Sequence, residues 1–219
     1  MTDLHNFFIM EDMSDKELQK IKQYSYNKHC KKGEIVFLEG DKDKRLFLVL
    51  SGLFKVFKTA STGRNKTLNI LGKGDFFGEM ALIDESRRLT SVQAINEGKL
   101  LVIDRNKYKE LIREFPEVAL KTIGILSLRL QEANQEIKNL TFQTTEDRLK
   151  KTLKEIGEKF GEKQEEEICI RQRFTHQELA DMVGTTRERI TRLLGSFQQE
   201  NLLRIENRTI FLNNSFFSS

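Results

Sequence analysis

The sequence is poor in the residues that build disulfide frameworks and metal sites. Its 219 residues include two cysteines, three histidines and one proline. Cys30 and Cys169 lie far apart along the chain, so they indicate neither a disulfide framework nor a zinc site. The histidines show no ligand spacing such as HExxH, and we therefore expect no protein-bound metal.

Long apolar runs are also missing. No run approaches the roughly 20 residues that a membrane helix needs. The first ten residues contain no basic segment that leads into a long apolar stretch, as a secretory signal would. We therefore expect a cytoplasmic protein without a membrane partner. The composition, 38% hydrophobic and 32% charged, is typical of a globular chain with one large domain or two small ones.

Positive charge is carried by arginine alone toward the C-terminus. The net charge is +4, which is compatible with a nucleic-acid partner. From Arg171 onward the chain has seven arginines and no lysine. Because arginine can donate two hydrogen bonds to a guanine edge or a phosphate, this part is the candidate for binding double-stranded DNA.

The N-terminal half predicts a small helix followed by short strands. Residues 14–24 are expected to form an amphipathic helix, in which Ser14 and Glu17 make a capping box. From about Lys32 to Ile103, short β-rich runs alternate with glycines. This pattern predicts an antiparallel roll or barrel, which can hold one small ligand inside.

A long helix is predicted from Pro116 to about Phe142, with Gly124 as its weakest point. Apolar residues recur along it at steps of three and four: Ile123, Leu126, Leu130, Ala133, Ile137 and Leu140. Periodicity alone leaves two interpretations open. The seam pairs two copies of the helix in a dimer, or the helix packs on its own domain.

Two short helices separated by a glycine are predicted for residues 175–196. Thr175 and Glu178 form a capping box, Gly184 allows the turn, and Thr186 caps the second helix. The inward positions are Leu179, Ala180, Val183, Ile190, Leu193 and Leu194. This is the arrangement of a helix-turn-helix. A helix is also expected before it, from Thr145 to about Gly161, and residues 161–167 are interpreted as an exposed connector.

The second helix leaves four side chains off its apolar face: Arg187, Glu188, Arg189 and Arg192. Arginine can donate to guanine N7 and O6, and glutamate can accept from cytosine N4. These residues therefore suit a short mixed G·C element. The alternative is two packed helices with a solvated arginine face, but the caps, the turn glycine and the arginines all favour DNA binding.

Short β-rich runs flank these two helices. ICIRQRF before them is interpreted as a short strand, and NLLRIE and TIFLN follow them. Glu206 and Asn207 lie between the last two runs and fit the tip of a wing, from which Arg208 reaches a phosphate.

The segment FFGEMALIDESRRLTSVQA has the chemistry of a cyclic-nucleotide cassette. Gly78 permits a close backbone approach, and Glu79 can accept a sugar hydroxyl. The turn that follows, which begins with Met80 and Ala81, exposes backbone N–H groups suited to a phosphate. Arg88 would neutralise that phosphate.

Together these motifs resemble the cyclic-AMP receptor protein and fumarate-nitrate regulator family, from KKGEIVFLEGD through FGEMALID and RRLTSVQA to GTTRERITRLL. The resemblance implies an α+β fold. Residues 1–115 would form an antiparallel, jelly-roll-type β-roll, residues 116–143 a long dimerisation helix, and residues 144–219 a winged helix-turn-helix. It also implies a homodimer on a pseudo-palindromic operator with half-sites like TGTGA, and RNA polymerase as a further partner.

The resemblance assigns site residues position by position. The effector set comprises Gly78, Glu79, Met80, Ala81, Arg88, Leu89 and Asn134. At the DNA site, Thr175, His176 and Gln177 match the family's phosphate contacts, and Arg187, Glu188 and Arg192 match its base-reading residues. The predicted DNA-binding set also includes Thr186 and Arg189 of the same helix and Arg208 of the wing. An effector would shift the dimer between two DNA-binding states.

Two departures from the family pattern leave the effector open. Leu89 stands where the family usually has Ser or Thr, and Ala133 and Asn134 stand where the cyclic-AMP receptor has two hydroxyl residues that contact adenine. Asn134 can still bond a purine, whereas Ala133 cannot. The effector is therefore cyclic AMP or another small molecule. Alternatively, the sensor is degenerate, and the protein is constitutively active or responds to a non-nucleotide ligand.

Other chemistries of the family, and enzymes, are not expected. Residues 1–29 contain no cysteine that could hold an iron–sulfur cluster. His29 is the only histidine near the predicted β-roll that could bind haem, so we expect neither cofactor. No nucleophile–base pair or Walker-type loop is found, so we expect no catalytic residues.

Overall fold

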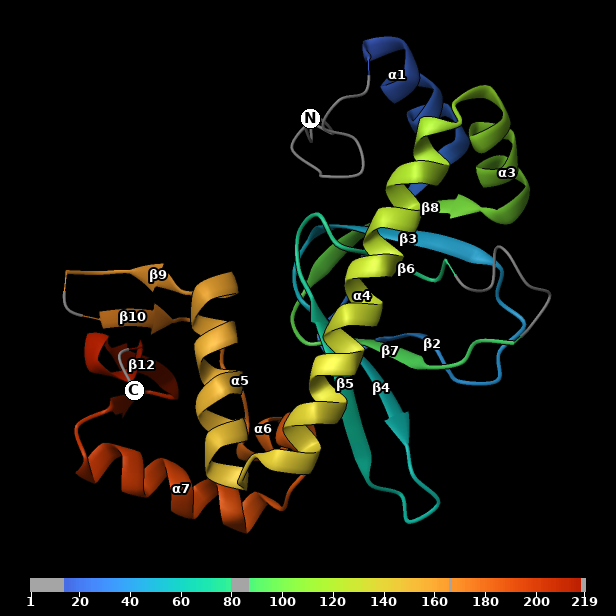
Figure 1. Cartoon of the computed structure of the whole chain (residues 1–219). Helices are drawn as coiled ribbons and strands as arrows, with labels where there is room; N and C mark the ends of the chain where they lie inside the picture. Colours follow the sequence, from blue (N-terminus) through green and yellow to red (C-terminus); the bar gives the residue numbers. More distant parts are fainter. Residues whose placement is uncertain (1–13, 80–86, 166, 218–219) are drawn as a thin grey trace. The chain divides into compact units, whose positions relative to one another are not determined.

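The computed structural model describes residues 14–79, 87–165 and 167–217, which form two compact units (Figure 1). The first unit comprises the described residues up to Lys58 together with Leu68–Glu132. The second comprises Thr59–Thr67 and the described residues from Ala133 onward. The long helix α4 (Glu117–Phe142) is continuous and contributes to both.

The β-roll has two antiparallel four-stranded sheets, with strand orders β1-β8-β3-β6 and β2-β7-β4-β5. The strands are β1 (Ser25–Cys30), β2 (Ile35–Phe37), β3 (Arg45–Ser51), β4 (Phe54–Thr59), β5 (Asn65–Leu71), β6 (Phe76–Phe77), β7 (Ser91–Ala94) and β8 (Gly98–Asp104). The predicted antiparallel roll is thus confirmed. The predicted start of the roll at about Lys32 was wrong, because its first strand, β1, begins at Ser25. That strand is polar at the sheet edge, and Cys30 is its only buried residue, so it carries no apolar periodicity.

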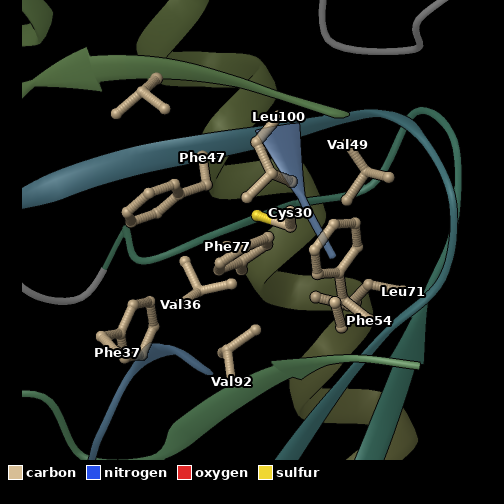
Figure 2. Packing of buried hydrophobic residues seen from close by; sticks show 12 residues of the cluster. Cys30, Val36, Phe37, Phe47, Val49, Phe54, Leu71, Phe77, Val92 and Leu100 are labelled. Atoms are coloured by element: carbon tan, nitrogen blue, oxygen red, sulfur yellow. The ribbon is translucent and has the colours of Figure 1, made fainter. Parts of the chain in front are cut away.

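Four buried phenylalanines pack in the core of the roll (Figure 2). Phe47 and Phe77 stack with ring centroids 5.0 Å apart. Phe37 lies 5.7 Å from Phe47 and 5.9 Å from Phe77, and Phe54 lies 6.1 Å from Phe77. Each such pair contributes about 0.5–1.5 kcal/mol beyond its buried area. The cluster therefore joins strands of both sheets at β6, the strand that leads into Gly78.

Helices α1 (Asp15–Tyr24) and α3 (Arg105–Glu114) pack beside the roll through a second core. The capping box predicted for α1 is confirmed, with Ser14 N donating to Glu17 Oε2 at 2.6 Å. Helix α3 was not predicted. Most of its residues are polar or charged and only Tyr108 and Leu111 are buried, so its apolar spacing is too sparse to recognise.

Helix α4 begins directly after Pro116, as predicted. Its side toward the roll is short and mixed: Val118 is buried, and the hydroxyl of Thr122 donates to Val118 O and lies 2.6 Å from the Tyr108 hydroxyl. Several large apolar side chains of the same helix are exposed: Leu120, Ile123, Leu128, Leu130 and Ile137. Of the predicted seam, Ile123, Leu130, Ala133 and Ile137 are exposed, Leu126 is half-buried, and the side chain of Leu140 lies outside the described part.

The second unit combines three further helices with an antiparallel sheet of order β11-β12-β10-β9. Its elements are α5 (Thr145–Phe160), β9 (Glu162–Lys163), β10 (Glu167–Ile170), α6 (His176–Val183), α7 (Arg187–Gln199), β11 (Leu203–Glu206), β12 (Thr209–Asn213) and the 3-10 helix η3 (Asn214–Phe217). The interpretation of residues 161–167 as a connector was partly wrong. Glu162 and Lys163 are exposed, but they pair with β10, and such a short polar strand has no pattern of its own.

Two further features are missing from the described residues. None of the helices there combines the length and the apolar character that a membrane crossing requires. Within the same part of the chain, no three His, Cys, Asp or Glu side chains are grouped so that they could hold a metal ion.

Candidate effector site and nucleic-acid interface

The structure brings Gly78 and Arg88 into direct contact in the β-roll. Gly78 follows β6 with φ of 90°, a conformation that L-residues with a side chain rarely adopt. A Cβ atom at this position would lie 2.7 Å from the Arg45 carbonyl oxygen and 2.7 Å from Arg88 Nη1. Only glycine fits here, because the Arg45 carbonyl and the Arg88 side chain leave no room for a Cβ atom.

Arg88 is 4% exposed, and most of its donors bind the protein itself. Nη1 donates to the Gly78 carbonyl at 2.9 Å, and Nη2 donates to the Arg45 carbonyl at 2.6 Å. The guanidinium lies 4.0 Å from the Phe37 ring centroid. Its Nε is buried and has no hydrogen-bond partner within the described residues. Arg88 is therefore a buried cation whose Nε–H is left for a further acceptor.

Asp43 and Arg45 complete this cluster and were not anticipated from the sequence. Arg45 binds the Asp43 carboxylate through two nitrogens, Nε to Oδ1 at 2.8 Å and Nη2 to Oδ2 at 3.0 Å. Asp43 Oδ1 also lies 3.4 Å from Arg88 Nη2. Asp43 and Arg88 are far apart along the chain, and no local spacing signals the contact.

Opposing effects set the pKa values in this cluster. Burial favours the neutral form of Asp43, but the hydrogen bond from Arg45 and the charge of Arg88 outweigh it, so the pKa of Asp43 is lowered. Burial also lowers the pKa of Arg88, against the opposing attraction of Asp43. Asp43 is thus an ionised partner of Arg88.

Glu79 is buried and paired with a residue of α4. Its Oε1 accepts from Arg129 Nη1 at 2.9 Å, and Arg129 Nη2 also donates to the Phe76 carbonyl. Glu79 is 6% exposed, so a counter-ion is required for its charge. Arg129 was missed because it lies 50 positions from Glu79 along the chain, and no local spacing signals the contact.

The structure describes only part of the remaining predicted effector set. Leu89 is 47% exposed and offers no hydroxyl. Met80 and Ala81 lie outside the described residues. Asn134 is an exposed residue of α4 in the second unit. The described cluster consists of three arginines and two carboxylates: Arg45, Arg88, Arg129, Asp43 and Glu79.

The helix-turn-helix is built as its sequence predicts. Thr175 caps α6 by accepting from Glu178 N at 3.1 Å, and Glu178 Oε2 accepts from Thr175 N at 2.7 Å. Gly184 ends the helix with φ of 75°, and its N–H donates to Ala180 O. Thr186 then caps α7 by accepting from Arg189 N at 3.3 Å. All six predicted inward positions are buried.

The opposite face of α7 is cationic and exposed. Arg187, Arg189 and Arg192 are exposed, and within the described part of the chain none of them makes an ion pair. Glu188 lies among them, and hydrogen bonds from its own backbone N–H and from Thr186 lower its pKa. The face therefore offers three cationic donors and one ionised acceptor, as readout of base edges requires.

The predicted phosphate contacts on α6 already have partners inside the motif. His176 Nδ1 lies 2.7 Å from the Thr191 hydroxyl, and that hydroxyl donates to Arg187 O at 3.0 Å. Gln177 Nε2 donates to Asp181 Oδ1 at 2.8 Å. Since the Thr191 hydroxyl proton goes to the Arg187 carbonyl, the His176 ring donates to that hydroxyl through Nδ1.

A two-residue turn forms the tip of the wing. Glu206 pairs with Thr209 across the β11–β12 hairpin, and Asn207 and Arg208 between them have φ of 50° and 65°. Two positive φ values in a two-residue hairpin loop define a type I′ turn, which favours Asn at its first position. Arg208 is exposed there. Behind it, Arg204 binds Glu167 at 2.6 Å and Glu206 at 2.6 Å, which braces the hairpin.

Comparison with known proteins places the chain in a family. Residues 27–115 match the model of the cyclic nucleotide-binding domain, and residues 147–215 match the Crp-like helix-turn-helix domain. The Cyclic AMP receptor protein of Thermus thermophilus is 32% identical over 207 residues, which cover 92% of this chain and 90% of that protein. The chain belongs to the Crp/Fnr family of transcription regulators.

Solved structures agree with this assignment. The Catabolite Activator Protein of Thermus thermophilus is 30% identical, with a TM-score of 0.57 over 96% of this chain and 95% of that one. The c-di-GMP responsive regulator CLP of Xanthomonas campestris is 24% identical and shows the same fold, with a TM-score of 0.81 over 92% of this chain and 100% of that one. The predicted α+β fold is confirmed. As a Crp/Fnr protein, the chain is a DNA-binding regulator with a cyclic nucleotide-binding-type β-roll.

Proposed function

We propose that this protein is a homodimeric regulator that binds a pseudo-palindromic operator and responds to a phosphate-bearing effector in its β-roll. The observation that carries the proposal is the buried cation Arg88, which lies beside Gly78 and whose Nε lacks an acceptor in the described residues. An anion at this position would satisfy both the charge and the donor.

Charge matching within the cluster supports an anionic effector. Asp43 is held by Arg45 at 2.8 Å and Glu79 by Arg129 at 2.9 Å, whereas Arg88 is 3.4 Å from its nearest carboxylate oxygen. Three guanidinium groups against two carboxylates leave one net positive charge. A cyclic nucleotide carries one negative charge and would balance it.

The exposed apolar residues of α4 support the homodimer. Ile123, Leu130 and Ile137 are each more than half exposed, although they repeat at a seven-residue spacing. A helix packed only on its own domain would bury such a row, and apolar patches of this kind mark interaction surfaces. We infer that a second copy of α4 covers them, as in a short coiled coil.

Signal transmission would begin at Glu79. An effector whose sugar hydroxyl binds Glu79 changes the partner of Arg129, and Arg129 belongs to α4. The effector would thereby bias how two α4 helices pair, and Asn134 is the residue that we propose contacts its base. Two α7 helices would then read TGTGA-like half-sites with Arg187, Glu188 and Arg192, and Thr186 and Arg189 would lie beside these residues. The phosphates would be contacted by Thr175, His176, Gln177 and Arg208. The bound protein would act together with RNA polymerase.

A second candidate is a regulator with a degenerate sensor. It is favoured by Leu89, which lacks the hydroxyl that usually joins the arginine at the phosphate, and by the two carbonyls that already accept from Arg88. Loss of one neutral hydrogen bond costs only about 1 kcal/mol, so an effector of lower affinity is the expected consequence rather than none.

Fluorescence anisotropy separates the two candidates. A labelled duplex with TGTGA and its inverted repeat is titrated at fixed salt, with and without cyclic AMP, because phosphate contacts make affinity strongly salt-dependent. Tighter binding with cyclic AMP supports the effector-responsive regulator. Equal and specific binding in both conditions, also with other nucleotides, favours the degenerate sensor. No preference for the inverted repeat over random DNA would contradict the proposed operator.

A further inference from the structure

Asp43 shares one oxygen between two arginines, and its position beside Arg88 is fixed by the backbone. Gly40 N donates to Arg88 O at 2.8 Å, and Arg88 N donates to Asp41 O at 2.9 Å. The loop that carries Asp43 is thus hydrogen-bonded to Arg88 on both sides. The Asp43 side chain is 11% exposed and that of Arg88 is 2% exposed, so water screens their attraction weakly.

An anion bound at Arg88 would meet the charge of Asp43. A phosphate and a carboxylate on the same guanidinium repel each other, and Asp43 cannot leave without breaking its two bonds to Arg45. Asp43 therefore opposes the anion. This opposition is limited, because Asp43 Oδ1 lies 2.8 Å from Arg45 Nε and 3.4 Å from Arg88 Nη2. Arg45 thus holds the carboxylate more closely than Arg88 does.

Resting on the proposed function, we propose that Asp43 and Arg45 set the affinity of the effector site: Asp43 competes with the effector phosphate for Arg88, and Arg45 restrains Asp43 from closing on Arg88. Neither side chain is needed to touch the effector. Both act through the orientation and charge available at Arg88, so they are positioning residues that determine affinity.

The proposal predicts changes of opposite sign at two neighbouring residues. Asp43→Asn keeps the shape of the side chain and removes its charge, so cyclic AMP binds more tightly, by about tenfold, or about 1.4 kcal/mol. Arg45→Gln releases Asp43 toward Arg88, so cyclic AMP binds more weakly by a similar factor. In the double variant the loss caused by Arg45→Gln disappears, because no carboxylate is left to close on Arg88.

Isothermal titration of the full-length variants with cyclic AMP, and in parallel with cyclic GMP, tests these signs. Asp41→Asn is the matched control. Its exposed carboxylate lies two positions away and accepts from Leu38 N at 2.8 Å, without a contact to Arg88. A gain with Asp41→Asn equal to that with Asp43→Asn would show a general charge effect and overturn the proposal. Weaker or unchanged binding by Asp43→Asn would also overturn it.

Thermal unfolding of each variant shows whether a change in cyclic AMP affinity comes from a damaged fold. Damage to the fold would weaken binding in both single variants, so it could not produce the tighter binding expected for Asp43→Asn. Operator binding by the same proteins separates this inference from the proposed function. Wild-type protein that fails to prefer the inverted repeat contradicts the proposed function. If the proteins bind the operator but neither nucleotide binds any of the variants, the proposed role of Asp43 and Arg45 is overturned.

Discussion

Arg129 Nη1 donates to Glu79 Oε1 at 2.9 Å, and this bond joins the buried acid of the effector cassette to the long helix α4. The Glu79 side chain is 7% exposed and that of Arg129 is 26% exposed. The two partners therefore differ in what each would lose when the other is removed.

We expect Arg129→Ala to lower the free energy of unfolding by about 2 kcal/mol, less than the roughly 3–5 kcal/mol for a fully buried pair. It leaves the Glu79 carboxylate buried without a counter-ion. Glu79→Gln should cost less, because Arg129 retains an amide acceptor and reaches solvent. Urea unfolding measures both. Lys107→Ala, which breaks the exposed Lys107–Glu110 pair, should leave the free energy of unfolding nearly unchanged. Equal effects of all three would contradict this prediction.

Gly78→Ala should damage both stability and effector binding. The added methyl would lie 2.7 Å from a backbone carbonyl and 2.7 Å from Arg88 Nη1, at a residue with φ of 90°. We expect a loss of at least about 1–3 kcal/mol, the usual cost of a strained backbone position. Gly195→Ala in α7 is the control, because nothing lies within 4 Å of its Cβ position. There the change should stabilise the helix by up to about 1 kcal/mol.

The fold was predictable where apolar periodicity or capping chemistry is strong. The capping boxes at Ser14 and Thr175 and the buried face of α7 follow from the sequence, because the interacting residues lie within one or two turns of each other. Strand β1, helix α3 and strand β9 have few buried residues and therefore no pattern to read.

The contacts of the candidate effector site were predictable only in part, for a related reason. Gly78, Glu79 and Arg88 belong to one short segment, and their spacing carries the chemistry. Arg129 reaches Glu79 from a position 50 residues away, and Arg45 and Arg88 are 43 positions apart. Such partners are chosen by the tertiary fold, and a single sequence does not encode the pairing in any local spacing.

Two arginines of the proposed DNA interface should behave differently, because we propose that Arg187 contacts a base and Arg208 a phosphate. Arg187→Ala removes a base contact, so it should cost about 1–3 kcal/mol on the operator and relax specificity at one base pair. Arg208→Gly removes a phosphate contact, so it should weaken binding to all sequences. It should also reduce the slope of log K against log salt concentration by about 1. Glycine is chosen for Arg208 because its φ is 65°. Anisotropy titrations over several salt concentrations, on operator and random duplexes, measure both. An equal loss on both duplexes for Arg187→Ala would contradict its role.

Leu130→Glu should convert the proposed dimer into a monomer. Leu130 is 64% exposed in the single chain, and a charge at the centre of a paired apolar seam would be buried without a partner. Sedimentation velocity measures the mass, and binding to the inverted repeat should be lost while a single half-site is bound weakly. Gln131→Glu, at the exposed neighbouring position, is the control and should remain dimeric. A dimeric Leu130→Glu protein would place the interface elsewhere.

The stability of the β-roll should depend on acid through Asp43. The pKa of Asp43 lies below its ordinary value of 3.8, because the bonds from Arg45 and the charge of Arg88 outweigh the effect of burial. A lowered folded-state pKa stabilises the protein above the unfolded-state value, and this contribution is lost as the pH falls through the folded-state value. The difference in unfolding free energy between wild type and Asp43→Asn should therefore shrink as the pH falls below about 5.

Measuring that difference by urea unfolding at several pH values isolates Asp43 from the other carboxylates, since these are common to both proteins. A difference that stays constant with pH would show that the charge of Asp43 adds nothing to the fold. A difference that shrinks would mean that the residue stabilises the empty β-roll at neutral pH. The same charge is the one that we infer to oppose the effector. Asp43→Asn would then be less stable and bind cyclic AMP more tightly, a combination that general damage to the fold does not produce.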